Sequence, residues 1–222
     1  GAIETLGRDM RDTGNVIRYN LIIDSVGFGT DRDGKILTPH FNWGIYLDDY
    51  SSGTTVYGNV VANTENGGIC VHGGRNNLFE NNILVEGAHH QIRLQPRDDF
   101  MANNRFRRNI VVYSNKDGEL VYTWLQNARP ENFAEWDYNV YHLKTADLAS
   151  LPVRNTPSGT FADWREAGWD AHSLIGDPLF VDPKKHDYRL RPESPAWKTG
   201  FKPIPFEKIG VKGYRHEQAT GG

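Results

Sequence analysis

Two aspartates stand at the same distance from an asparagine in different parts of the chain. Asp9 lies eleven residues before Asn20, and Asp48 lies eleven residues before Asn59. If both segments belong to a repeating unit, the two carboxylates share a register and lie on adjacent coils about 5 Å apart. Such a pair suits glycosidic cleavage with retention, whereas a gap of roughly 6.5 to 9.5 Å leaves room for an inverting water. Asp9 and Asp48 are therefore candidate catalytic residues.

Asp49 follows Asp48 directly and is an alternative to it. Strict alternation along residues 44–49 turns Asp48 outward, but strands bend at their ends, so Asp49 stays a candidate. Repulsion between two close carboxylates raises the pKa of one of them, as a general acid requires. The structural alternative is that these aspartates only satisfy turn amides between coils.

The same outward face collects further groups that can bind or orient a sugar. Imidazole and guanidinium groups beside carboxylates can bind hydroxyls or hold an acidic sugar. Aromatic rings near a strand start can stack on sugar rings, although such rings more often pack. Glu4 is in addition a second candidate acid. The candidate binding residues are Glu4, His40, Trp43, Tyr46, His72, Arg75, His90 and Arg93.

An asparagine recurs at a fixed place between apolar residues, and this repeat indicates how the face is built. The pattern of apolar residue, two residues, Asn, one residue and apolar residue is centred on Asn20, Asn59, Asn81, Asn109 and Asn139, which are 39, 22, 28 and 30 residues apart. Units that cannot bury an apolar face alone must stack on one another. We therefore predict an all-β parallel β-helix of about five rungs with a structural asparagine ladder. A β-sandwich would not require Asn at one offset.

The chain divides into three expected segments according to where apolar residues alternate with polar ones and where this alternation ends. Period-two alternation along 44–49, 68–72 and 91–95 turns Ile45 and Leu47, and their equivalents, inward. Rungs are expected over residues 1–145, with an insertion over 26–43. Residues 146–210 are expected to form an irregular C-terminal cap. A short helix is predicted over 160–168, from an N-cap threonine, an acidic residue three positions on and a final glycine. Residues 211–222 are expected to be a loose tail.

Composition excludes several functional classes. The chain has 222 residues, 23 of them glycine, with a net charge of −3, and its mean hydropathy is −0.61. The near-neutral charge argues against a nucleic-acid partner, and no window is apolar enough to suggest a membrane span. A single cysteine, Cys70, cannot form an internal disulfide, and no His/Cys spacing suits zinc.

The insertion over residues 26–43 is long for a loop in a solenoid, and such loops are usually functional or mobile. It contains Asp31 and Asp33, which match part of a calcium-binding loop without its later ligands. The predicted chemistry requires no cofactor. A calcium site at these two aspartates is the alternative.

Six short segments suggest a family. They are GRD (7–9), GNVIRYN (14–20), GIYLDD (44–49), GGRNNLFENN (73–82), DPLFVD (177–182) and SPA (194–196). Together they resemble the C-terminal half of bacterial right-handed parallel β-helix proteins similar to glycoside hydrolase family 141, which includes fucosidase and xylanase activities. The resemblance implies a right-handed helix and a secreted or periplasmic location. It points to Asp9 and to one of Asp48 and Asp49. Because such family members are longer, it also implies a truncated or unusually small member.

The leading hypothesis is a glycoside hydrolase that acts on a plant or microbial carbohydrate polymer or oligosaccharide through the aspartate pair. A polysaccharide lyase on the same scaffold is the first alternative. It would need an acidic substrate, a neutralising cation and a basic proton abstractor, and the predicted face carries Arg75 and Arg93 but no lysine. A non-catalytic carbohydrate-binding or structural β-helix is the second alternative.

Overall fold

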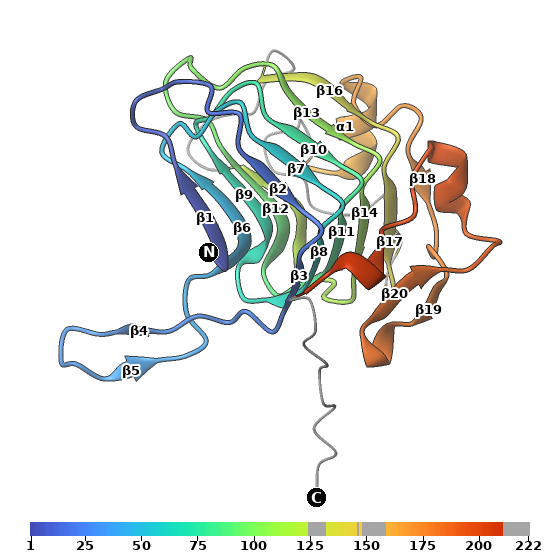
Figure 1. Ribbon diagram of the computed structural model, residues 1–222, viewed down its shortest axis with the longest axis horizontal. Coiled ribbons are helices and arrows are strands. Elements are labelled where there is room, and N and C mark those ends of the chain that lie inside the picture. The colour runs from blue at the N-terminus through green and yellow to red at the C-terminus, as the bar shows by residue number, and fades with distance from the viewer. Residues whose placement is uncertain (124–131, 146, 148–158, 211–222) are drawn as a thin grey trace, which may run out of the picture.

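The computed structural model describes residues 1–123, 132–145, 147 and 159–210. It is a parallel β-helix whose successive coils add one strand to each of three parallel sheets (Figure 1). The first sheet contains, in spatial order, β1 (Ile3–Leu6), β6 (Trp43–Asp48), β9 (Gly67–His72), β12 (His90–Gln95) and β15 (Glu119–Thr123). Five coils are described in this sheet, which confirms the predicted fold class.

The other two sheets follow the same order of coils. The second sheet contains β2 (Val16–Arg18), β7 (Thr55–Tyr57), β10 (Leu78–Glu80), β13 (Asn104–Arg107) and β16 (Phe133–Asp137). The third sheet contains β3 (Leu21–Ile23), β8 (Val60–Thr64), β11 (Ile83–Gly87), β14 (Ile110–Tyr113), β17 (Val140–Leu143) and β18 (Leu174–Ile175).

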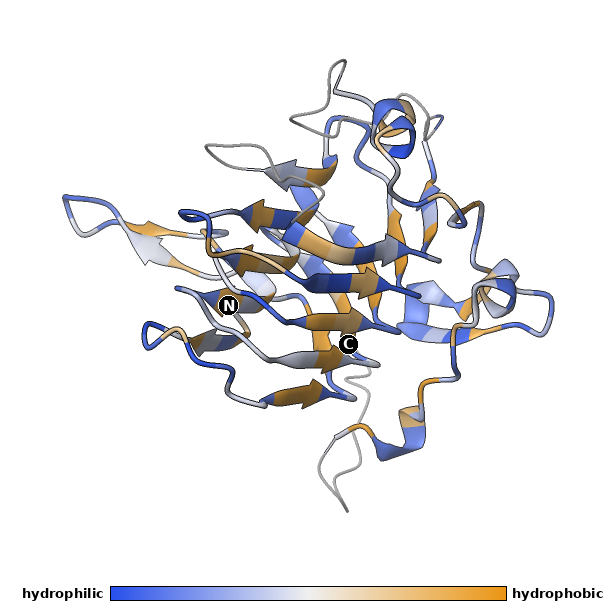
Figure 2. Ribbon diagram, turned by 90° about the horizontal axis from the view of Figure 1, so that it is seen from above, coloured by the Kyte–Doolittle hydropathy of each residue, from blue (hydrophilic) through white to orange (hydrophobic). Residues whose placement is uncertain are grey.

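The core lies inside the coils and is made by the inward side chains of all three sheets. Ile45 and Leu47 of β6 are fully buried there, together with Phe79 of the second sheet and Leu84 of the third. Because β-strand side chains alternate between faces, the residues between these turn outward, as the sequence predicted. Figure 2 shows hydrophobic residues along the strands and hydrophilic residues in most of the turns.

Asparagines, buried in every coil but the first, connect the coils at the corner between the second and third sheets. The backbone N–H of each ladder residue donates to the side-chain oxygen of the next, at 3.1 Å from Asn20 to Asn59 and 2.9 Å from Asn82 to Asn109. In the third coil the ladder residue is Asn82, so the prediction of Asn81 was wrong. Register confirms the offset, because Phe79 pairs with Val56 and Leu84 pairs with Val61.

Asn81 makes contacts outside the ladder. Its backbone is left-handed, with φ of 62°. Its side chain donates to the carbonyl of Lys202 at 2.9 Å and accepts the backbone N–H of the same residue at 2.6 Å. Asn81 therefore ties a corner of the solenoid to the C-terminal segment.

The insertion after the first coil forms a small hairpin. Its strands, β4 (Gly29–Thr30) and β5 (Ile36–Leu37), are antiparallel, and the hairpin projects from the body of the solenoid (Figure 1). Asp31 directs the turn, since its side chain accepts the backbone N–H groups of Asp33 at 3.0 Å and Lys35 at 2.8 Å.

The segment after the fifth coil closes the end of the solenoid. Helix α1 (Phe161–Glu166) begins at the N-cap Thr160 with a capping box to Asp163, which confirms the predicted short helix. Its buried Phe161 and Trp164 join the inner core, where the Trp164 and Trp136 ring centroids lie 5.1 Å apart. The open end of the apolar core is thereby covered.

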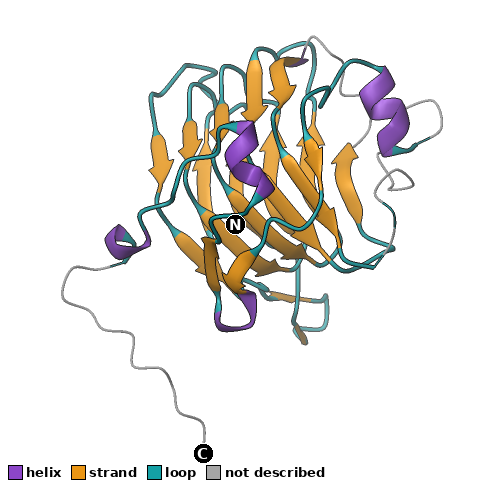
Figure 3. Ribbon diagram, turned by 90° about the vertical axis from the view of Figure 1, so that its right-hand side faces the viewer, coloured by secondary structure: helices purple, strands orange, loops and turns teal. Residues whose placement is uncertain are grey.

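The remaining C-terminal residues lie along the outer side of the third sheet. They form β19 (Phe180–Asp182), β20 (Asp187–Leu190) and the 3-10 helices η3 (Pro183–Lys185), η4 (Pro195–Thr199) and η5 (Phe206–Lys208) (Figure 3). Phe180, Tyr188 and Phe201 share an apolar cluster with Val60 and Val112 of the third sheet. This segment thus covers one side of the solenoid across several coils. The predicted tail, 211–222, lies outside the described residues.

Candidate functional site

The outward row of the first sheet places five of its residues in one register. Glu4, Tyr46, Cys70, Arg93 and Tyr122 are successive partners along the five strands. Of the sequence candidates, this row therefore holds Glu4, Tyr46 and Arg93. Cys70 is fully buried beneath its neighbours, and its burial raises the pKa of its thiol.

Asp48 lies at the end of β6 and is held by two neighbours. His72 Nδ1 lies 2.6 Å from Asp48 Oδ1, and the Tyr46 hydroxyl donates to the same carboxylate. Burial by itself would raise the pKa of Asp48, but these hydrogen bonds and that of the Asp49 N–H outweigh it and lower the pKa of the carboxyl. Asp48 is therefore a carboxylate at neutral pH.

Asp49 is neutralised by two arginines from distant coils. Its backbone is left-handed, with φ of 36°, and the residue is 8% exposed. Arg8 Nε lies 2.5 Å from one carboxylate oxygen, and Arg97 Nη1 lies 2.7 Å from the other. His72 Nδ1 is 3.5 Å away. Both oxygens of Asp49 are thus occupied by guanidinium groups, which suits a structural anion that fixes those arginines.

Asp9 is not the register partner of Asp48. Leu6 of β1 pairs with Asp48, and Asp9 lies three residues beyond Leu6 in an exposed turn. Nine residues (7–15) separate β1 from β2, whereas six (49–54) separate β6 from β7. The eleven-residue count assumed turns of equal length, so the predicted shared register was wrong. The argument for carboxylates about 5 Å apart, which rested on that register, no longer holds.

A packed group lies near the starts of β6 and β12 in the first sheet. It contains Trp43, His90 and Arg93. Trp43 Nε1 lies 3.1 Å from His90 Nε2, and the Arg93 guanidinium lies 5.1 Å from the Trp43 ring centroid. Gly67, on β9 between β6 and β12, makes room for the contact between Trp43 and His90. A Cβ at Gly67 would meet the His90 carbonyl oxygen at 2.4 Å. Trp43 is only 1% exposed, so it presents no free ring face for a sugar.

The loop after β12 contacts both Asp49, through Arg97, and a further sequence candidate, Arg75. The Arg97 guanidinium lies 5.0 Å from the Tyr50 ring centroid, and Tyr50 donates to Asp98 at 2.7 Å. Arg75, one of the predicted binding residues, packs on Phe100 of this loop at 4.5 Å from its ring centroid. Arg8 and Arg97 were missed by sequence reasoning. The only sequence signal was the position of Arg8 inside the GRD segment, next to Asp9.

Two of the candidates contact other groups. Glu4 is exposed and pairs with the terminal amino group at 2.7 Å. His40 is exposed at the base of the β4–β5 hairpin, where its ring centroid is 6.3 Å from that of Phe41.

The described residues contain one group of three metal-type ligands, formed by Asp48, Asp49 and His72, whose ligand atoms all lie within 4.8 Å of one another. Arg8 and Arg97 already supply two positive charges to this Asp48 cluster, so its donors fit a metal ion poorly. Asp31 and Asp33 are not part of any such group in the described chain.

Comparison with protein families agrees with this architecture. Residues 7–133 match the family model described as right handed beta helix region. The chain therefore belongs to the right-handed β-helix family, and such domains are common in enzymes that act on polysaccharides. Comparisons with curated proteins and with solved structures found no match. None of the helices in the described ranges is long and apolar enough to cross a membrane.

Proposed function

We propose that the chain is a glycoside hydrolase that acts on a carbohydrate polymer or oligosaccharide at the outer face of the first sheet. The observation that supports this most is the environment of Asp48, whose carboxylate accepts hydrogen bonds from His72 and Tyr46 and has a lowered pKa. An ionised carboxylate held in one orientation acts as nucleophile or as base toward a water in glycosidic cleavage.

The other carboxyl groups divide the remaining roles. Asp49 is a positioning residue, because its two oxygens are bonded to Arg8 and Arg97 and so hold both guanidinium groups in place. Asp9 is the proposed general acid, since it is an exposed carboxyl next to Arg8, which reaches the Asp48 cluster. A general acid must reach the leaving group of the substrate, so its carboxyl has to be open to the surface, as that of Asp9 is.

The lyase alternative has weaker support from the same contacts. Its charge-neutralising role would fall on arginines, yet Arg8 and Arg97 are bound to Asp49. Arg93 lies between the Trp43 and Tyr122 rings, at 5.1 and 5.6 Å from their centroids. These guanidinium groups already have partners, so they favour a structural role over the capture of a uronate.

The test is a reducing-sugar assay over neutral and acidic plant polysaccharides, read beside the absorbance of unsaturated uronates. Asp48→Asn and Asp9→Asn should each lower sugar release at least 100-fold with little change in melting temperature, because each removes a catalytic carboxyl from a position at or near the surface. Asp182→Asn, on the C-terminal hairpin, is the matched control and should retain full activity. Full activity of both Asp48→Asn and Asp9→Asn would overturn the proposal, and unsaturated products would establish the lyase instead.

A further inference from the structure

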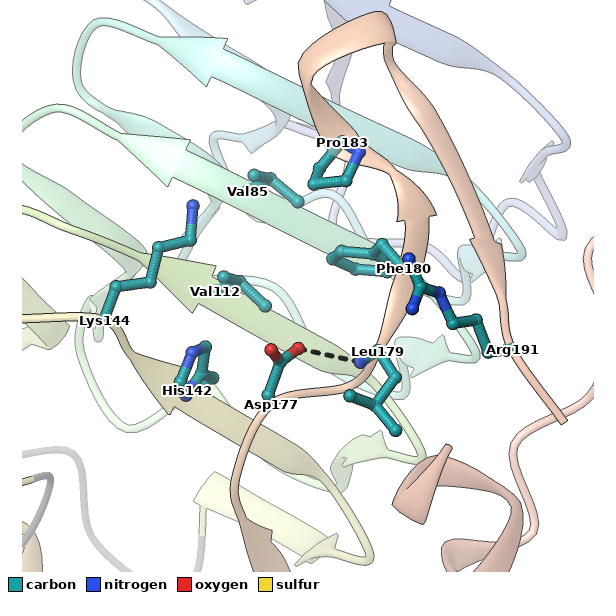
Figure 4. Close-up of a pocket in the computed structure, with 9 residues that line it drawn as sticks. All are labelled: Val85, Val112, His142, Lys144, Asp177, Leu179, Phe180, Pro183 and Arg191. Atoms are coloured by element: carbon teal, nitrogen blue, oxygen red, sulfur yellow. Dashed lines mark hydrogen bonds between the residues drawn. The ribbon is translucent and has the colours of Figure 1, made fainter. Parts of the chain in front are cut away.

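A cavity of about 390 Å³ lies between the third sheet and the hairpin β19–β20 (Figure 4). Its lining comes from three consecutive strands of that sheet, β11, β14 and β17, from Lys144 directly after β17, and from residues 177–191. The third sheet shares no strand with the first sheet, which carries the Asp48 cluster. The cavity is therefore separate from the proposed catalytic face, and its volume is within the usual range for small-molecule sites.

The floor of the cavity is apolar except at one position. Val85, Val112 and His142 are register partners in β11, β14 and β17, so their side chains form one row on the outer face of the sheet. Phe180 of β19 packs in the same apolar cluster as the two valines. An apolar floor suits the C–H groups of a sugar but offers nothing to its hydroxyl groups.

Hydrogen-bond acceptors for hydroxyl groups come from Asp177 and His142. One oxygen of Asp177 accepts the backbone N–H of Leu179 at 2.8 Å, which fixes the carboxylate and leaves its second oxygen for a ligand. His142 replaces the valine of the preceding strands in the row, and no hydrogen bond or ion pair joins it to another described residue. A neutral imidazole offers one donor and one acceptor, so it can bind two hydroxyl groups.

Hydrogen-bond donors come from the two cations of the lining, Arg191 and Lys144. Arg191 Nη2 donates to the Val181 carbonyl at 3.2 Å, and Lys144 donates to Glu86 at 2.7 Å. Each of these bonds uses one of several N–H donors on the cation. Glu86 pairs with Lys144, and the lining carries one further cation, Arg191, and one anion, Asp177. The charges of these four groups sum to zero, so the site offers donors and acceptors without an excess of positive charge. Such a balance favours a neutral, hydroxyl-rich ligand over an anion.

We propose that this cavity is a second carbohydrate-binding site, which takes one neutral sugar unit. The sugar unit occupies the cavity above this floor, its hydroxyl groups donate to Asp177, and Arg191 donates to them. The site does not depend on the proposed hydrolysis, since it can bind a sugar unit of a chain without cleaving it. It would hold a polysaccharide at a second point on the solenoid.

The test is saturation-transfer NMR of the whole chain with D-glucose, D-galactose, D-xylose and D-glucuronate as probes, followed by titration of those that bind. At least one neutral sugar should bind, and Arg191→Met or Asp177→Ala should each weaken that binding at least tenfold. Lys185→Met, on the same hairpin but outside the cavity lining, is the matched control and should bind as the unaltered chain does. Circular dichroism of each variant checks that it remains folded.

Two further results bear on the assignment. Binding should persist in Asp48→Asn, which separates failure of this site from failure of the proposed hydrolase. The proposal is overturned if none of the neutral sugars binds, if D-glucuronate binds at least tenfold more tightly than all of them, or if Arg191→Met and Asp177→Ala both bind as well as Lys185→Met.

Discussion

Asp48 and Asp49 are neighbours of the same type, yet their surroundings give them different chemistry. Asp48 is bonded by an imidazole and a phenol, and it lies at the end of a strand in the first sheet. Asp49 is bonded by two guanidinium groups from residues 41 and 48 positions away in the chain. The alternation of a strand favoured Asp48 as the outward residue, with Asp49 kept as the alternative. The two arginines that separate their roles could not be predicted, because they arrive from loops whose paths no local pattern determines.

His72 should control the ionisation of Asp48. Its hydrogen bond lowers the pKa of the Asp48 carboxyl, so His72→Ala should move that pKa upward. The measurement is a ¹³C NMR titration of the aspartate carboxyl carbons, which requires no substrate. His89→Ala is the matched control, because His89 is an exposed histidine that lies 3.3 Å from Glu65, away from Asp48. An unchanged or lower Asp48 pKa in His72→Ala would contradict the assigned hydrogen bond.

At the scale of strands and turns, the sequence predicted the repeating unit more accurately than it predicted which residues pair between neighbouring coils. Four of the five ladder asparagines were identified, because buried side-chain amides at one offset leave a strong signal. The fifth was misassigned because Asn81 and Asn82 are adjacent, and both stand between apolar residues. The Asp9 error has a similar origin. A turn that is three residues longer in the first coil leaves the apolar pattern intact but shifts every side chain counted across it.

The two adjacent asparagines should differ sharply in their effect on stability. Asn82 donates to the Val56 carbonyl at 3.0 Å and to Asn109 at 2.9 Å, and it accepts two hydrogen bonds from Asn59, all of them buried. Asn82→Ala should therefore lower the free energy of unfolding by about 3 kcal/mol or more.

Asn81→Gly is the matched control for that substitution. It keeps the left-handed backbone of Asn81 and removes only the bonds to Lys202, which are partly open to water, so it should cost about 1 kcal/mol. Urea unfolding of both variants gives the comparison. Equal losses, or a larger loss for Asn81→Gly, would contradict the assignment of the ladder residue.

Across the whole molecule, the ladder has a direction and therefore needs an end. Each asparagine donates to the next coil, so Asn139 in the fifth coil would have unmet donors. Asp170 and Ser173 in the closing segment provide the acceptors, at 3.0 Å from Asn139 Nδ2 and 2.7 Å from its backbone nitrogen. Trp164 of α1 also donates to Asp170, at 2.9 Å. The segment after the fifth coil thus completes both the apolar core and the hydrogen-bond ladder.

Asp170 makes the stability of this end depend on pH. The residue is fully buried, and burial raises the pKa of its carboxyl from 3.8 to about 6, although four hydrogen bonds oppose the shift. The folded chain therefore holds the proton more tightly than the unfolded chain. Protonated Asp170 stabilises the fold by about 3 kcal/mol relative to the ionised form. This stabilisation is fully present below pH 3.8 and is lost as the pH rises through about 6. Asp170→Asn cannot ionise, so the free energy of unfolding of the unaltered chain should fall by about 2.5 kcal/mol relative to this variant between pH 4 and pH 7. Urea unfolding at both pH values measures the difference, with Asp33→Asn on the exposed β4–β5 hairpin as the control. A difference that stays constant between the two pH values would mean that Asp170 is not the group that titrates.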